Sequence, residues 1–278
     1  MIFIFGTPCA AEQTAADGET STRLPAEPSM DTFLKLYQPY LANISAYEPM
    51  YFLVGTDPSQ TKFQISLKYR PFGDRNALMK KHPWVGGIHF GYTQTSFWDL
   101  ASESAPFEDT SYKPELFYIT SNLRFRPDWM EGFFIQSGIR HESNGRAGDA
   151  SRSTNTLYFQ PIFIFYNPAS RLGLGVSTRL WCYVDNDEET NPDLDDYRGY
   201  FALNLKVGKA DGFVLGATLG WAGQGVSLYA DLTYPLSRLM SSSAGLYLQV
   251  QYVDALAESL LDYRERNRAL RFGFAIVR

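Results

Sequence analysis

The chain has 278 residues, of which 20% are charged, and a formal net charge of −5. This length allows one large all-β domain or two small ones, and the acidic balance gives no support for nucleic-acid binding. The two cysteines, Cys9 and Cys182, form no CxxC pair, so they indicate neither a zinc site nor a disulfide framework. No run approaches 18 consecutive apolar residues, which argues against a transmembrane helix but not against a membrane barrel.

The N-terminal part of the chain reads as a leader. Residues 1–11 are a short apolar run ending in small residues, as in the tail of a signal peptide without its basic start. Residues 12–30 are rich in Ala, Thr, Glu and Pro and are expected to be flexible. Residues 34–47 fit either a short amphipathic segment or a plug-like extension. We therefore expect a signal remnant and flexible segment over 1–48 and a single domain over 49–278.

From Tyr51 onward, alternating segments are separated by turn-forming residues. The clearest is residues 61–70, where every second side chain is Phe, Ile, Leu or Tyr and the others are mainly Lys, Gln and Ser. Residues two apart share one face of a strand. About twelve such segments begin near Tyr51, Lys62, Trp84, Glu115, Gly132, Asn155, Gly173, Arg198, Gly212, Val226, Gly245 and Ala269.

An even number of antiparallel strands of about ten residues is what a closed outer-membrane barrel requires. The alternative is a soluble β-sandwich or lipocalin-like barrel, whose apolar residues face inward. The strand number, the tyrosine-rich segment ends and the secretory start favour the membrane. We predict an all-β fold, a transmembrane antiparallel β-barrel of 12 strands with a short N-terminal extension.

The strand expected from Gly132 ends in residues that can carry chemistry. Its apolar face runs through Ile139 to His141 and Ser143, so a base and a hydroxyl project side by side from the end of that face. Such a pair is the minimum apparatus for a serine nucleophile. Asn155 heads the next strand on its apolar face, where its carbonyl could fix the tautomer of the His141 ring. Spacing alone also allows three ordinary polar residues at a strand end.

The loop after Ser143 is short, polar and rich in glycine. It could hold an oxyanion through an amide such as that of Gly145, or a hard cation through carbonyl and hydroxyl oxygens. It could equally be a surface turn. The acidic run of residues 185–189 could attract calcium, although most such runs are solvated. No GxSxG elbow is present, which argues against an α/β-hydrolase.

Gln94 stands out on another predicted strand. It continues the apolar face formed by Ile88, Phe90 and Tyr92. A lone amide that faces lipid is costly unless it is paired, so Gln94 indicates a protein contact within the membrane.

Several separated motifs together resemble the Gram-negative outer-membrane phospholipase A family. The catalytic segment of that family is similar to His141-Glu142-Ser143-Asn144-Gly145-Arg146, followed by Ser151-Arg152-Ser153 and Asn155. Further similar segments are Tyr92-Thr93-Gln94, Ser104-Ala105-Pro106-Phe107, Asn191-Pro192-Asp193 and Glu258-Ser259-Leu260-Leu261-Asp262-Tyr263. The resemblance extends from about Tyr51 to the end of the chain.

This resemblance implies a calcium-dependent phospholipase A1/A2 in the outer membrane, acting on glycerophospholipids and lysophospholipids. Ser143 would be the nucleophile, His141 the general base and Asn155 the group that orients His141, all on the lipid-facing barrel wall. A non-catalytic outer-membrane channel or structural barrel is the alternative, and a soluble lipid-binding barrel is a second rival.

The resemblance also implies a cofactor and an assembly. Calcium would be held by the backbone oxygens of Ser104 and Arg146 and by the side chain of Ser151, and the Gly145 N–H would contribute to the oxyanion hole. The family is active as a calcium-promoted homodimer, in which Gln94 would be an interface contact. The chain departs from the family pattern at Glu189 and Thr190, where aspartate is expected, which argues against a second, regulatory calcium site.

Overall fold

The structure is a computed structural model that describes residues 38–278, apart from 57–59, 74–75, 101, 188 and 241–244. The expected signal remnant lies outside the described residues. The strands are β1 (Ile44–Ala46), β2 (Met50–Gly55), β3 (Thr61–Tyr69), β4 (Ile88–Trp98), β5 (Phe107–Ile119), β6 (Gly132–Ser143), β7 (Ser153–Asn167), β8 (Leu172–Asn186), β9 (Phe201–Gly208), β10 (Val214–Ala222), β11 (Gly225–Pro235), β12 (Tyr247–Leu256) and β13 (Arg266–Val277).

The helical segments of the described chain are short. They are α2 (Ala77–Lys81), α3 (Leu194–Arg198) and the 3₁₀ turns η1 (Pro39–Asn43), η2 (Pro83–Gly87), η3 (Gly148–Ala150) and η4 (Leu236–Arg238). None of the helices in this part of the chain is long and apolar enough to span a membrane.

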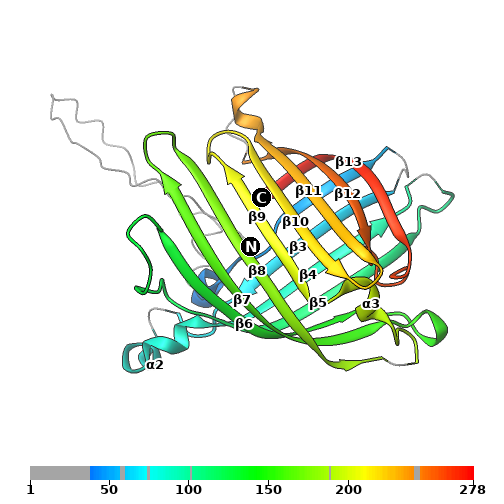
Figure 1. Ribbon diagram of the computed structural model, residues 1–278, viewed down its shortest axis with the longest axis horizontal. Coiled ribbons are helices and arrows are strands. Elements are labelled where there is room, and N and C mark those ends of the chain that lie inside the picture. Colours follow the sequence, from blue (N-terminus) through cyan, green and yellow to red (C-terminus); the bar gives the residue numbers. More distant parts are fainter. Residues whose placement is uncertain (1–37, 57–59, 74–75, 101, 188, 241–244) are drawn as a thin grey trace.

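In the described chain, strands β2 to β13 form one closed antiparallel barrel (Figure 1). Each strand pairs with its neighbour in the sequence, and the pairing of β13 with β2 closes the ring. The predicted 12-stranded barrel is therefore confirmed. The short strand β1 also pairs with β3, with Ala46 opposite Leu67, so residues 44–46 pack on the barrel although the sequence grouped them with the N-terminal segment.

The predicted strand starts agree closely with the observed ones except at β4 and β5. β4 begins at Ile88 because the preceding residues form the 3₁₀ turn η2. β5 begins at Phe107 rather than near Glu115, because the strand accommodates Pro114 opposite Tyr92. Proline lacks the N–H that a strand interior normally uses, yet β5 continues on both sides of it.

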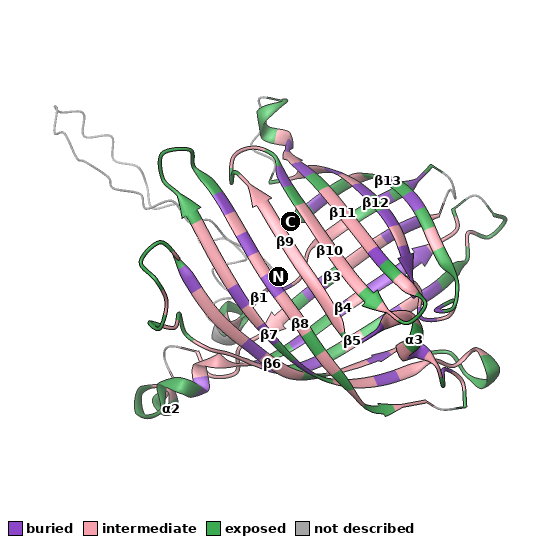
Figure 2. Ribbon diagram, in the orientation of Figure 1, coloured by how far each residue is buried: buried purple, intermediate pink, exposed green. Residues whose placement is uncertain are grey.

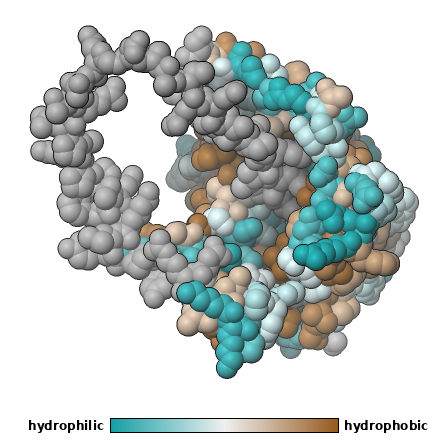
Figure 3. Space-filling view, turned by 90° about the vertical axis from the view of Figure 1, so that its left-hand side faces the viewer, coloured by the Kyte–Doolittle hydropathy of each residue, from teal (hydrophilic) through white to brown (hydrophobic). Residues whose placement is uncertain are grey.

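The two faces of the barrel wall differ in chemistry. On β3, Ile65 and Leu67 are 48% and 42% exposed, whereas Lys62 and Ser66 are buried. Buried and more exposed positions alternate along many of the strands (Figure 2). Figure 3 shows hydrophobic residues along the side of the barrel and hydrophilic residues gathered on its connecting segments. Apolar residues outside and polar residues inside are the arrangement of a membrane barrel and the reverse of a soluble one.

Ion pairs satisfy the charged residues inside the barrel. Glu115 pairs with Arg140 at 2.8 Å and with Arg179 at 3.3 Å. Glu142 pairs with Arg198 at 2.8 Å. The Glu115–Arg140 pair joins directly opposite residues of β5 and β6, whereas the other two pairs link β5 to β8 and β6 to α3. Each buried charge thus has an opposite charge beside it, as buried charges require.

A second interior cluster involves Glu258, which lies just after β12. Its carboxylate is 2.9 Å from Lys62 and 2.7 Å from Arg271, and all three side chains are at most 6% exposed. Burial opposes ionisation of Glu258, but the two cations outweigh burial and lower its pKa to about 2. The cluster therefore depends on a fully ionised carboxylate.

Antiparallel pairing places alternate connections at the same end of the barrel. The segments between β4 and β5, β6 and β7, β8 and β9, and β12 and β13 therefore lie at one end, which we call the loop end. The start of β2 and the end of β13 lie at the other end. His141 and Ser143, as the last residues of β6, are at the loop end.

Candidate active site

His141, Ser143 and Asn155 lie on one patch of the outer wall at the loop end. Ile139, on the same face of β6, is 55% exposed, whereas Glu142 on the opposite face is buried and pairs with interior cations. β6 pairs with β7 so that His141 is directly opposite Asn155. The strand register thus brings the three residues together from two strands.

A hydrogen bond joins two members of this group. His141 Nδ1 is 2.9 Å from Asn155 Oδ1. An amide oxygen only accepts hydrogen bonds, so Nδ1 carries the proton and Nε2 is left as the basic nitrogen. This is the tautomer that a general base beside a serine hydroxyl requires.

Ser143 lies two residues beyond His141 on the same face. Within the described chain, the hydrogen bond of the His141 ring is to Asn155 and not to Ser143. Two residues of a strand span about 6.6 Å, a distance that an imidazole and a hydroxyl can close by rotation of their side chains. Catalytic hydrogen bonds of this kind are commonly long before substrate binds.

Asn144 organises the loop that follows. Its side chain is 5% exposed, its Nδ2 donates to the Ala150 carbonyl at 2.9 Å, and its Oδ1 accepts from the backbone N–H groups of Arg146 and Arg152 at 3.3 and 3.0 Å. One buried amide therefore crosslinks both limbs of the loop and fixes the direction of its backbone groups.

Gly145 requires its small size. Its φ of +68° lies in the left-handed region, and an added Cβ would be 2.9 Å from the Tyr112 ring. Both the backbone conformation and the close approach of Tyr112 exclude a larger residue. The Gly145 N–H is thus held in a defined direction two residues after Ser143.

The three calcium candidates come from two loops. Arg146 and Ser151 lie in the loop between β6 and β7, and Ser104 lies between β4 and β5. The Arg146 guanidinium donates to the Glu108 carbonyl at the start of β5. This hydrogen bond ties the Arg146 loop to the strand that follows Ser104.

The backbone around Ser104 is strained. Ser104 and Ala105 have φ values of 67° and 39°, which non-glycine residues rarely adopt. The Trp98 indole N–H donates to the Ala105 carbonyl at 2.7 Å and helps hold this conformation. Such strain gathers at functional sites, where surrounding contacts maintain it. In the described chain, no group of three His, Cys, Asp or Glu residues is arranged to hold a metal. The candidate donors named above are the neutral oxygens of Ser104, Arg146 and Ser151.

The Gln94 amide is satisfied within its own strand. Tyr92 Oη donates to Gln94 Oε1 at 3.1 Å, and Gln94 Nε2 donates to Ser96 Oγ at 3.2 Å. The partner that the sequence analysis required for this amide is thus supplied by β4 itself. These three side chains form a polar stripe on the outer wall.

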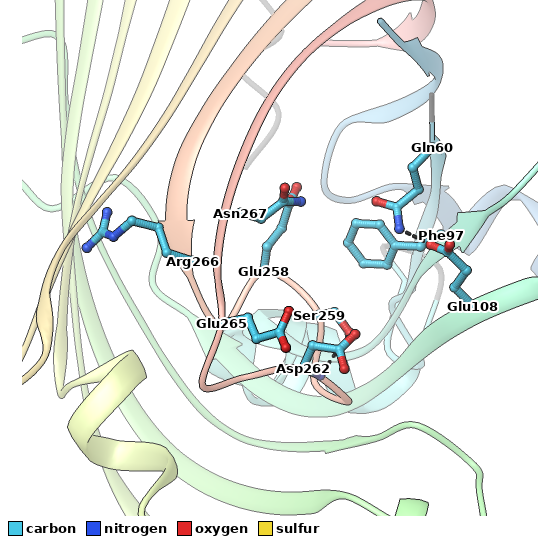
Figure 4. Close-up of a pocket in the computed structure, with 9 residues that line it drawn as sticks. All are labelled: Gln60, Phe97, Glu108, Glu258, Ser259, Asp262, Glu265, Arg266 and Asn267. Atoms are coloured by element: carbon cyan, nitrogen blue, oxygen red, sulfur yellow. Dashed lines mark hydrogen bonds between the residues drawn. The ribbon is translucent and has the colours of Figure 1, made fainter. Parts of the chain in front are cut away.

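Two cavities of the described structure lie away from the His141 patch. One, of about 440 Å³, is at the loop end and is lined by Gln60, Phe97, Glu108, Glu258, Ser259, Asp262, Glu265, Arg266 and Asn267 (Figure 4). The other, of about 480 Å³, lies in the polar interior. Neither is lined by the candidate catalytic residues, which lie on the outer wall.

The described acidic residues near position 185 contact different partners and do not form one cluster. Asp185 accepts a hydrogen bond from Asn155, Asp187 accepts one from the Thr190 N–H, and Asp193 pairs with Arg264. The sequence placed Asp185 only within an acidic run that could attract calcium, and Asn144 only within the segment similar to the family's catalytic segment, with no individual role for either. An Asn-Gly pair at a strand end is a turn signal and could have identified Asn144. No spacing rule identifies Asp185, because it reaches Asn155 only across a strand irregularity.

Comparisons with known proteins give a consistent result. A family model described as phospholipase A1 matches residues 35–276. Phospholipase A1 of Escherichia coli (strain K12) is 32% identical over 216 residues, which are 73% of this chain and 65% of that protein. The chain thus spans just under two thirds of the length of that relative.

The similarity to solved structures covers a larger share of both chains. The outer membrane phospholipase A of Escherichia coli superposes with a TM-score of 0.67 at 25% identity, covering 84% of this chain and 97% of that one. The Salmonella typhi outer membrane phospholipase, solved as a dimer with bound calcium, superposes with a TM-score of 0.66 at 24% identity, covering 84% and 91%.

Proposed function

Because the chain belongs to the phospholipase A1 family, we propose that it is an outer-membrane phospholipase A1/A2 that hydrolyses acyl esters of glycerophospholipids and lysophospholipids. The observation that carries the proposal is the His141–Asn155 hydrogen bond on the outer wall, with Ser143 on the same face. Groups on this face of a membrane barrel meet lipid directly. Conduction through a channel does not require an oriented histidine on the lipid-facing wall.

Ser143 Oγ attacks the ester carbonyl carbon, and His141 Nε2 accepts its proton. The imidazolium then gives that proton to the departing alcohol oxygen, which leaves the acyl group on Ser143. A water molecule, deprotonated by the same nitrogen, attacks this acyl-enzyme, and the imidazolium returns the proton to Ser143 Oγ as the fatty acid is released. Asn155 Oδ1 holds the Nδ1 proton throughout, so that Nε2 stays directed at the reacting atoms.

The oxyanion formed in each step needs a donor close to Ser143. The N–H of Gly145 is suited to this role because the positive φ and the contact with Tyr112 fix its direction. A preorganised backbone donor stabilises developing charge without reorganising during the reaction.

Calcium is the proposed cofactor. The carbonyls of Ser104 and Arg146 and the hydroxyl of Ser151 are oxygen donors, the ligand type that this hard cation prefers. The buried Asn144 amide and the hydrogen bond from the Trp98 indole to the Ala105 carbonyl hold these loops in place, which supports the assignment. When bound there, calcium would supply positive charge and a polarised water beside the oxyanion.

We also propose that the active form is a calcium-promoted homodimer. A single barrel offers only one side of an acyl-chain cleft, and a second copy would complete it. The exposed aromatic ring of Tyr92 and the Gln94 amide beside it form a mixed apolar and polar patch suited to such an interface. The related Salmonella typhi protein was solved as a dimer with bound calcium.

The test is fatty-acid release from phospholipid in mixed micelles by protein refolded in detergent, measured with calcium and with a chelator. Calcium should raise the rate by at least about 100-fold, because a bound cation contributes several kcal/mol to the stabilisation of an oxyanion. No release from folded protein under either condition, together with ion conductance in planar bilayers, would support the channel instead.

A further inference from the structure

An irregularity in the wall lies beside the His141 patch. β7 and β8 pair with Thr156 opposite Tyr183, but the next pair is Asn155 opposite Asp185. Val184 is therefore an extra residue with no partner, which makes this a β-bulge in β8. Val184 is 64% exposed.

The bulge decides which face Asp185 occupies. Arg179 and Trp181, at odd positions of β8, line the interior cavity. Strict alternation would place Asp185 in the interior as well. The extra residue reverses the alternation and brings Asp185 onto the outer wall directly beside Asn155. Bulges next to active sites commonly redirect a side chain in this way.

Asp185 meets the one part of the Asn155 amide that His141 leaves free. Asn155 Nδ2 donates to Asp185 Oδ2 at 3.3 Å, and Asn155 Oδ1 faces His141 Nδ1 at 2.9 Å. The two ends of an amide differ chemically, because the nitrogen only donates and the oxygen only accepts. Reversing the amide would place its NH₂ group against the protonated Nδ1 of His141 and its oxygen against a carboxylate. Both contacts therefore favour the same orientation.

We propose that Asp185 is a positioning residue of the catalytic group. Resting on the proposed function of Ser143, His141 and Asn155, this inference adds a fourth member that acts through Asn155. The Asp185 carboxylate holds the amide so that its oxygen, rather than its nitrogen, faces the imidazole. Asp185 itself touches neither substrate nor His141, and its hydrogen-bond acceptance, rather than its charge, is what the site uses.

The experiment compares Asp185→Ala, Asp185→Asn, Asn155→Ala and the double variant Asn155→Ala/Asp185→Ala in the fatty-acid release assay. Glu189→Ala is the matched control, because it also removes a carboxylate at the loop end. The hydrogen bond of Glu189 to Asp187 comes from its backbone N–H, which the substitution keeps. Heat-dependent gel mobility establishes that each barrel is folded. Wild-type activity is measured first, so failure of the proposed function appears there and independently of Asp185.

Asp185→Ala should lower kcat about 3- to 10-fold with KM unchanged. This loss is smaller than the loss expected for a buried positioning residue, because Asp185 is solvent-exposed. Asp185→Asn should stay within about 2-fold of wild type, since its amide oxygen can still accept from Asn155. In the Asn155→Ala background, Asp185→Ala should add no further loss, because residues acting as one unit are non-additive.

Other results would overturn the assignment. An equal loss from Asp185→Ala with and without Asn155 would show that Asp185 acts independently of the amide. A kcat that recovers fully at high calcium would make it a cation ligand. A change in kcat no larger than that of Glu189→Ala, or an Asp185→Asn variant as slow as Asp185→Ala, would also contradict positioning by hydrogen bonding.

Discussion

Replacing Ser143 with alanine is expected to lower fatty-acid release by at least about 10³-fold, because it removes the hydroxyl that forms the acyl-enzyme. The side chain is half-buried and contributes little to the wall, so the barrel should fold normally. The rate is measured with calcium on protein whose heat-dependent gel mobility matches wild type.

Substitutions of the neighbouring residues are expected to lower the activity to different extents. His141→Ala should be as severe as Ser143→Ala, since the base and the nucleophile act as a unit. Asn155→Ala should cost less, about 10- to 100-fold, because it only orients the ring. Ser153→Ala is a suitable control, because Ser153 pairs with Ser143 across β6 and β7 and has no assigned role. Full activity in folded Ser143→Ala would remove the proposed nucleophile.

Replacing Glu258 with alanine is expected to lower the free energy of unfolding by about 3–5 kcal/mol, because Lys62 and Arg271 would remain buried without a counter-charge. Urea unfolding followed by tryptophan fluorescence measures the change. Glu265→Ala, an exposed carboxylate in the same connection, should change stability by less than about 0.5 kcal/mol. Equal effects of the two substitutions would show that the buried cluster is not stabilising.

The Glu258 carboxylate also makes the stability of the folded barrel depend on pH in acid. Its pKa is lowered from 4.5 to about 2 in the folded barrel, so its stabilising contribution is fully present above pH 4.5 and is lost as the pH falls through 2. Glu258→Ala should remove this part of the acid dependence, leaving the variant flatter than wild type over that range.

The barrel could be predicted because its alternation is a local property. Each strand exposes apolar side chains to lipid and polar ones to the interior, so the period of two is visible in short windows. The observed start of β5 at Phe107 differs from the predicted start near Glu115, because pairing with β4 extends the strand across Pro114, which lies opposite Tyr92. The ion pairs of Glu115 with Arg179 and of Glu258 with Lys62 join residues far apart in the chain, and no local pattern specifies them.

The candidate site was predicted less completely. His141, Ser143 and Asn155 could be grouped from the alternation and a hairpin, since register follows from both. Asp185 could not, because a single extra residue at Val184 reverses the face it occupies. The role expected of Gln94 rested on an amide without a partner, and the structure supplies that partner from Tyr92 and Ser96. The dimer contact at Gln94 remains a proposal.

The most direct test of a serine nucleophile on the lipid-facing wall is to locate the adduct formed by a long-chain, serine-reactive fluorophosphonate. Folded protein is treated in micelles with calcium or chelator, digested and mapped by mass spectrometry. We predict a single calcium-dependent adduct on Ser143, lost in His141→Ala. An adduct on a different serine, or none on protein that releases fatty acid, would contradict the assignment of Ser143.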